Sequence, residues 1–89
     1  MFKPTQEPAK TLYEALVAEQ LNRKGRSVAQ WIEAERMVVF AKATELAQSS
    51  GQRPPTIEQI IVAENSACGH TDYAAKFAYS LAEILRTNN

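Results

Sequence analysis

The sequence is poor in several residue types, and each shortage excludes a class of protein. A single cysteine, Cys68, cannot form an internal disulfide, so a small disulfide-stapled fold is excluded. Three glycines and four prolines in 89 residues are too few for a disordered chain or for a fold of many strands and turns. No stretch approaches about 18 consecutive apolar residues or has the layout of a signal peptide, so we expect a cytoplasmic protein.

An excess of charge of one sign is also missing, because ten basic residues balance ten acidic ones. A protein that coats nucleic acid needs a positive field, so any phosphate would have to be bound by a local patch. Hydrophobic residues make up 45% of the chain and charged residues 22%, which is typical of a globular domain. A domain of this size has a thin stability margin, which a partner or a second copy would improve.

Apolar residues recur at helical spacing in four segments, and no segment alternates as a strand does. The fold class that follows is all-α: one small bundle-like domain at residues 10–89, with a long central second helix. Two prolines indicate an extended N-terminal arm at residues 1–9. The predicted helices cover about residues 10–23, 28–49, 57–67 and 72–86.

Polar residues mark the expected start of three helices. Ser27 with Gln30, and Thr56 with Gln59, have the spacing of a capping box, in which each side chain bonds the other residue's backbone amide. Thr71 is expected to cap the last helix, since hydroxyl side chains favour this position.

Glycine and proline mark the helix ends. Gly25 is expected to end the first helix, and Gly51 stands where a left-handed residue would stop the second. Pro54 and Pro55 prevent the second helix from continuing. Gly69 allows a turn after the third helix.

The second helix contains the run MVVFA, residues 37–41, which would cover a whole helix turn with apolar side chains. A helix that is apolar all round is usually buried all round. Too few other helices are available to surround it, so we expect part of this girdle to face a second subunit. The alternative is that the proline arm covers Met37 or Phe40. The residues expected at the subunit interface are Trp31, Met37, Val38 and Phe40.

The charged residues beside Trp31 have a simpler interpretation. Glu33, Glu35 and Arg36 are expected at the surface or at the rim of an interface, where they could fix the register of paired subunits. Trp31 itself is expected to pack in the core more readily than to serve as a stacking platform.

A basic cluster precedes the second helix. Arg23, Lys24 and Arg26 lie directly before Ser27, where their charge adds to the helix dipole and to the free amides of the first turn. This combination favours an anionic ligand. A solvated loop is the alternative, and Glu19, four residues before Arg23, could pair with it.

His70 and Thr71 precede the last helix and form a second, weaker candidate for anion binding. Near them, Cys68 and His70 could act as nucleophile and base, with Asp72 beside them. Two possible ligands at this spacing match no common zinc site. The simpler interpretation is a helix corner in which Cys68 is a small apolar plug and Asp72 pairs with Lys76. We therefore expect no catalytic residue, no metal and no cofactor.

The run from Gly69 to Ala78, Gly-His-x-Asp-Tyr-x-x-Lys-Phe-Ala, resembles small helical accessory proteins of tailed phages and prophages. The resemblance extends over roughly the last third of the chain. It implies a role inside a bacterial host cell, in host takeover or counter-defence, where such proteins bind and block a target or sequester a signal molecule.

Three functions follow as hypotheses. The preferred one is a non-catalytic homo-oligomer that blocks a host protein or sequesters a small anionic, nucleotide-like ligand, without contact with a membrane. The second is a small helical nucleic-acid-binding protein that uses the basic loop at residues 23–26, although no second basic stripe supports it. The third is a small enzyme built on Cys68, His70 and Asp72.

Overall fold

The computed structural model describes residues 3–88, and within that range it contains four helices and no strand. The helices are α1 (Ala9–Gln20), α2 (Val28–Ser49), α3 (Ile57–Ala67) and α4 (Tyr73–Thr87). This confirms the predicted all-α, bundle-like domain, in which α2 is the longest helix at 22 residues. No helix in this part of the chain combines the length and the apolar character needed to cross a membrane.

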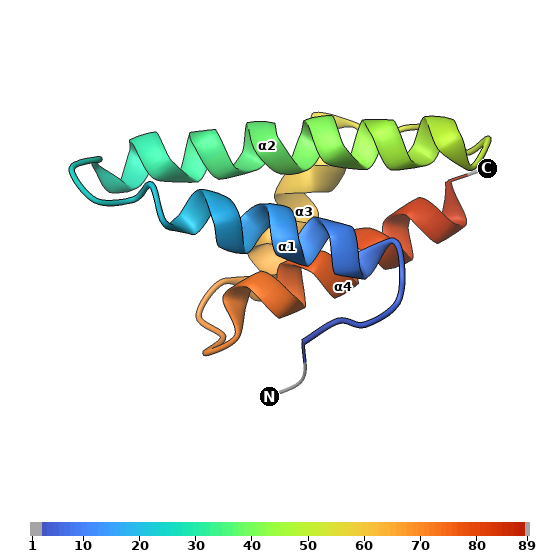
Figure 1. Ribbon diagram of the computed structural model, residues 1–89. Helices are drawn as coiled ribbons and strands as arrows, with labels where there is room; N and C mark the ends of the chain where they lie inside the picture. Colours follow the sequence, from blue (N-terminus) through green and yellow to red (C-terminus); the bar gives the residue numbers. More distant parts are fainter. Residues whose placement is uncertain (1–2, 89) are drawn as a thin grey trace.

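The four helices are not packed equally closely against one another. Figure 1 shows α2, α1 and α4 stacked one below the other, while α3 crosses behind them. α1 packs against both α2 and α4, and α3 packs mainly against α4, with far fewer contacts to α2. One long side of α2 is therefore left with little cover from the rest of the chain.

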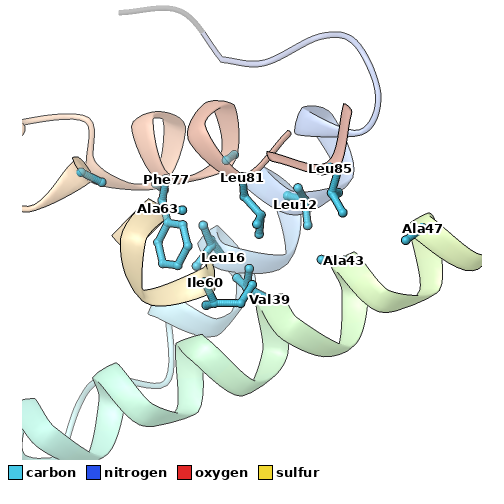
Figure 2. Close-up of a cluster of buried hydrophobic side chains, with 13 residues drawn as sticks. Leu12, Leu16, Val39, Ala43, Ala47, Ile60, Ala63, Phe77, Leu81 and Leu85 are labelled. Atoms are coloured by element: carbon cyan, nitrogen blue, oxygen red, sulfur yellow. The ribbon is translucent and has the colours of Figure 1, made fainter. Parts of the chain in front are cut away.

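The core lies where the four helices meet, and Figure 2 shows its side chains converging from all of them. Phe77, Leu81 and Leu85 of α4 project towards Leu12 and Leu16 of α1. α2 and α3 contribute mostly small side chains, which allows the helices to approach closely. The buried apolar cluster is Leu12, Leu16, Val39, Ala43, Ala47, Ile60, Ala63, Ala67, Ala74, Phe77, Ala78, Leu81 and Leu85.

Both predicted capping boxes are confirmed. The Ser27 hydroxyl accepts from the Gln30 amide at 3.2 Å, and the Gln30 side chain accepts from the Ser27 amide at 2.8 Å. Thr56 and Gln59 make the same two bonds, each 3.1 Å long. The prediction for Thr71 is wrong, since the residue before α4 is Asp72 and it makes no side-chain cap bond.

The helix ends agree with the glycine signals, except that α1 is shorter than predicted. α1 stops at Gln20, because Asn22 and Arg23 donate their amides three residues back and tighten the chain into a turn. Gly25 follows in that turn with φ +81°. Gly51, with φ +70°, ends α2 in a Schellman motif, with the Gln52 amide bonded to the Ala47 carbonyl at 2.9 Å.

The predicted apolar girdle of α2 is not buried all round within the chain. α2 buries a single stripe, Glu35, Val39, Ala43 and Ala47, and Met37 is 52% exposed. The cause is the arrangement of the helices, because α1 covers one side of α2 and α3 covers another only lightly.

The N-terminal segment does not cover Met37 either. Residues 1–2 of the predicted arm lie outside the described residues, and α1 begins at Ala9. Thr5 to Ala9 line a hollow with Leu46 near the end of α2 and with Tyr79 of α4. The arm therefore lies against α4 and the far end of α2.

Candidate functional site

A partly buried ion pair connects the turn after α1 to α2. The Nε and Nη2 atoms of Arg23 donate to the two carboxylate oxygens of Glu35 at 2.6 and 2.9 Å. The Glu35 side chain is only 2% exposed, so the expectation that it is a surface charge is wrong. The hydrogen bonds to Glu35 raise the pKa of Arg23, which therefore stays charged.

Two aromatic rings surround the Arg23 guanidinium. Its central carbon lies 3.6 Å from the ring centroid of Trp31, one helical turn before Glu35, and 5.9 Å from that of Tyr73. Tyr73 also packs edge-on against Phe77, at 5.7 Å between centroids. Burial, together with the negative charges of Glu64 and Glu35, raises the pKa of Tyr73 above its usual range, so its hydroxyl stays protonated.

A second ion pair joins α2 to α3. Arg36 donates from Nε to one carboxylate oxygen of Glu64 at 2.8 Å, and its Nη2 atom lies 2.7 Å from the same oxygen. Glu64 is buried, whereas the Arg36 side chain remains 34% exposed. Since α2 and α3 touch at few other points, this pair is a principal connection between them.

Both ion pairs border one pocket of about 330 Å³, which we call the arginine pocket. It lies between the first half of α2, the end of α3 and the start of α4. Its lining is Arg23, Trp31, Ile32, Arg36, Glu64, Asn65, Cys68, Gly69 and Tyr73. Each guanidinium uses two of its nitrogens on a glutamate and keeps further N–H groups free. The lining therefore combines the two guanidinium groups with one carboxylate, that of Glu64, and with the polar side chains of Asn65 and Tyr73.

The predicted basic cluster does not act as one unit. Arg23 turns inward to Glu35, while Arg26 forms a salt bridge with Glu19 at 3.0 Å. Glu19 therefore pairs with Arg26, and the expected pair with Arg23 is wrong. Ser27 uses its hydroxyl in the capping box, and Lys24 is exposed. Of the four residues, only Arg23 lines the arginine pocket.

The corner between α3 and α4 also differs from expectation. Cys68 is exposed, so it is not an apolar plug, and it lines the arginine pocket. His70 and Thr71 are exposed and do not line it. Within residues 3–88 no hydrogen bond joins the side chains of Cys68, His70 and Asp72, and Asp72 forms no ion pair with Lys76.

The residues expected at a subunit interface occupy three environments. Trp31 belongs to the arginine pocket, and Met37 lines an adjoining groove. Phe40 is partly buried against the core, and Val38 is also partly buried. Their role in an interface between copies stays a prediction.

Sequence reasoning missed four functional candidates: Glu35, which holds Arg23, and the lining residues Arg36, Glu64 and Tyr73. A signal for the first was present, because Glu35 precedes Val39 by four residues on the stripe that continues through Ala43 and Ala47. A carboxylate on an apolar stripe indicates a buried charge that needs a partner. Spacing alone could not name that partner.

Within the described residues, no group of three or more His, Cys, Asp or Glu side chains is arranged to hold a metal ion. Comparison with known proteins adds no relative: no family model, no curated protein and no solved structure matches the chain.

Proposed function

We propose that this chain is a non-catalytic binding protein that holds a small anionic ligand in the arginine pocket. One observation carries the proposal: two guanidinium groups, Arg23 and Arg36, are each fixed by a buried carboxylate and line the same pocket. Arginine forks are the side chains best suited to bind carboxylate and phosphate groups.

The glutamates prepare the arginines for binding. An arginine on a free surface loses rotamer freedom when it takes a ligand, whereas Arg23 and Arg36 have already lost much of it to Glu35 and Glu64. The four charges sum to zero, so the ligand is held by directed hydrogen bonds in a half-closed site more than by a long-range positive field. The protonated hydroxyl of Tyr73 adds a neutral donor.

The size of the pocket favours a small molecule over a nucleic-acid strand. A volume of about 330 Å³ lies near the lower end of the roughly 300–1,000 Å³ range of ligand pockets. The nucleic-acid alternative relied on the loop at residues 23–26, where Arg23 and Arg26 are now engaged with carboxylates. The enzyme alternative loses support because Cys68 and His70 make no hydrogen bond to each other in the described range.

The resemblance to phage accessory proteins suggests what such binding would serve. In a bacterial host cell, a protein that sequesters a small anionic signal would remove it from a host response. A homo-oligomer remains part of this proposal, because Met37 leaves an apolar side chain exposed on α2.

The first experiment is native mass spectrometry of the gently purified chain, which reports both the subunit number and any retained ligand. Titration with phosphate, benzoate and adenosine monophosphate would follow, read through the fluorescence of Trp31, the only tryptophan in the sequence. Trp31 touches Arg23, so an anion that binds this guanidinium should change the emission.

Arg36→Gln should weaken binding by tenfold or more, the cost of about 1.4 kcal/mol expected when a charged hydrogen bond is lost. Arg53→Gln is the matched control, because it removes the same charge from an exposed position outside the pocket. If circular dichroism shows that both variants are folded and their affinities are equal, the ligand does not use the arginine pocket.

A further inference from the structure

We infer that the ligand is amphiphilic, with an anionic head in the arginine pocket and an apolar chain that lies in the groove beside it. The inference rests on the proposed function, since it assigns the head group to the same two arginines. It adds the second half of the ligand, a saturated carbon chain of the kind found in a medium-chain carboxylate.

A second hollow adjoins the arginine pocket along α2. It measures about 540 Å³ and lies between the first half of α2 and the start of α3. Its lining is Ala29, Ile32, Glu33, Arg36, Met37 and Ile57, and we call it the α2–α3 groove. Ile32 and Arg36 line both hollows, so one turn of α2 borders the two sites.

Apolar side chains in the groove lack cover from the rest of the chain. Met37 is 52% exposed and Ile57 is 39% exposed, although both belong to helices that meet the core elsewhere. They are left open because α3 crosses α2 with few contacts. Covering them with a carbon chain would be favourable at about 25 cal/mol per Å² of apolar surface buried.

The distribution of charge gives the ligand a direction. Arg23, Arg36 and Tyr73 line the arginine pocket with one carboxylate, that of Glu64, whereas the α2–α3 groove has Arg36 and the exposed carboxylate of Glu33 on its lining. An anionic head can bond two guanidinium groups in the first site, but in the second only one, beside the like charge of Glu33. The head therefore belongs with the arginines and the tail with Met37 and Ile57.

Arg36 stands where the two halves of the ligand would meet. Its guanidinium, fixed by Glu64, faces the head group, and its aliphatic stem offers an apolar surface beside Ile32. A chain leaving the carboxylate can then pass over Ile32 into the groove.

The test is a series of straight-chain carboxylates, from acetate through butanoate and hexanoate to octanoate, each below its micelle concentration. Binding is read by Trp31 fluorescence and by protection of the Cys68 thiol from iodoacetamide, since Cys68 is exposed and lines the arginine pocket. We expect affinity to rise about three- to fourfold for each methylene that enters the groove.

Variants separate the two halves of the site. Met37→Ser and Ile57→Ser should flatten the gain with chain length and leave acetate and phosphate binding unchanged, while Arg36→Gln should weaken every member of the series. Val62→Ser is the matched control, because Val62 is 61% exposed on α3 but lines neither hollow. It should behave as the unchanged protein does.

The outcomes distinguish this inference from the proposed function. If short anions bind through Arg36 and chain length adds nothing, the amphiphilic ligand is wrong and the anion site stands. If no anion of either panel binds, both proposals fail. Binding of a peptide with an apolar C-terminal residue, without binding of octanoate, would replace the small ligand by a peptide and also overturn the inference.

Discussion

Arg23 and Glu35 form a two-armed ion pair between the turn that follows α1 and α2, with nitrogen–oxygen distances of 2.6 and 2.9 Å. The carboxylate lies on the buried stripe of α2. The guanidinium that binds this carboxylate also lies over the ring of Trp31. The pair thus fixes the return of the chain from α1 to α2 and shapes one wall of the arginine pocket.

Loss of the Glu35 charge should destabilise the fold. Glu35→Gln removes the charged acceptor and leaves Arg23 beside a neutral amide, so we expect a loss of about 1–3 kcal/mol in the free energy of unfolding. Urea denaturation followed by circular dichroism measures it. Glu45→Gln is the control, since Glu45 is exposed and its contact with Lys42 is 3.6 Å long, and it should cost less than about 0.5 kcal/mol. Equal stability of the two variants would contradict a structural role for the Arg23 pair.

Two hydroxyl residues at helix starts should differ in their effect on stability. Ser27→Ala removes the acceptor of a complete capping box and should cost about 1 kcal/mol. Thr71→Ala removes a hydroxyl that makes no cap bond and should cost less than about 0.5 kcal/mol. Thermal unfolding of both variants tests this difference, and a larger loss for Thr71→Ala would show that the first turn of α4 is capped by threonine.

Gly51 should be hard to replace, although space surrounds it. A Cβ at this position would meet no atom within 4 Å, so the cost of Gly51→Ala comes from the backbone angle of φ +70° alone. We expect about 1 kcal/mol for alanine and less for asparagine, which tolerates the left-handed region better. Chemical denaturation of the two variants gives the comparison, and an alanine variant as stable as the parent would mean that the Schellman turn is not needed.

Tyr73 should ionise at a higher pH in the folded chain than in an unfolded one. Burial, with the charges of Glu64 and Glu35, raises its pKa in the folded chain above the value of about 10 found in an unfolded one. The folded state therefore binds this proton more tightly, so the stabilising contribution is complete below about pH 10 and decreases as the pH rises further.

A spectrophotometric titration of tyrosinate, with unfolding measured between pH 8 and 11 in parallel, checks this prediction. Tyr73→Phe should remove part of the loss of stability at high pH. Tyr79 is 47% exposed, so Tyr79→Phe should not change the loss of stability at high pH. The same pH dependence in both variants would be inconsistent with a raised pKa at Tyr73.

The sequence-based predictions that were confirmed depend on residues close together in the chain. The capping boxes at Ser27 and Thr56 were confirmed because each involves residues three apart, whose geometry the helix itself sets. Gly51 was confirmed for a similar reason, since its backbone angle follows from where the helix stops. Gly25 marked the end of α1 less accurately, because α1 already ends at Gln20 and the chain turns before Gly25.

The predictions that the structure altered concern residues whose burial depends on contacts with other helices. Five consecutive apolar residues indicate burial all round, and a second subunit over part of them stays a prediction. Within the chain, Met37 faces the open groove because α3 touches α2 lightly. Cys68 was expected to plug a corner and instead lines a pocket. Periodicity shows which residues share a face, and it cannot show how much of that face another element covers.

The sequence by itself determined four helices, most of their ends and the balance of charge, because caps, glycine turns and helical spacing act within a few residues. Only the tertiary structure decided the candidate site. Arg23 meets Glu35 across 12 positions and Arg36 meets Glu64 across 28. Such partners are selected by the angles at which the helices cross, and those angles come from the packing of the whole core.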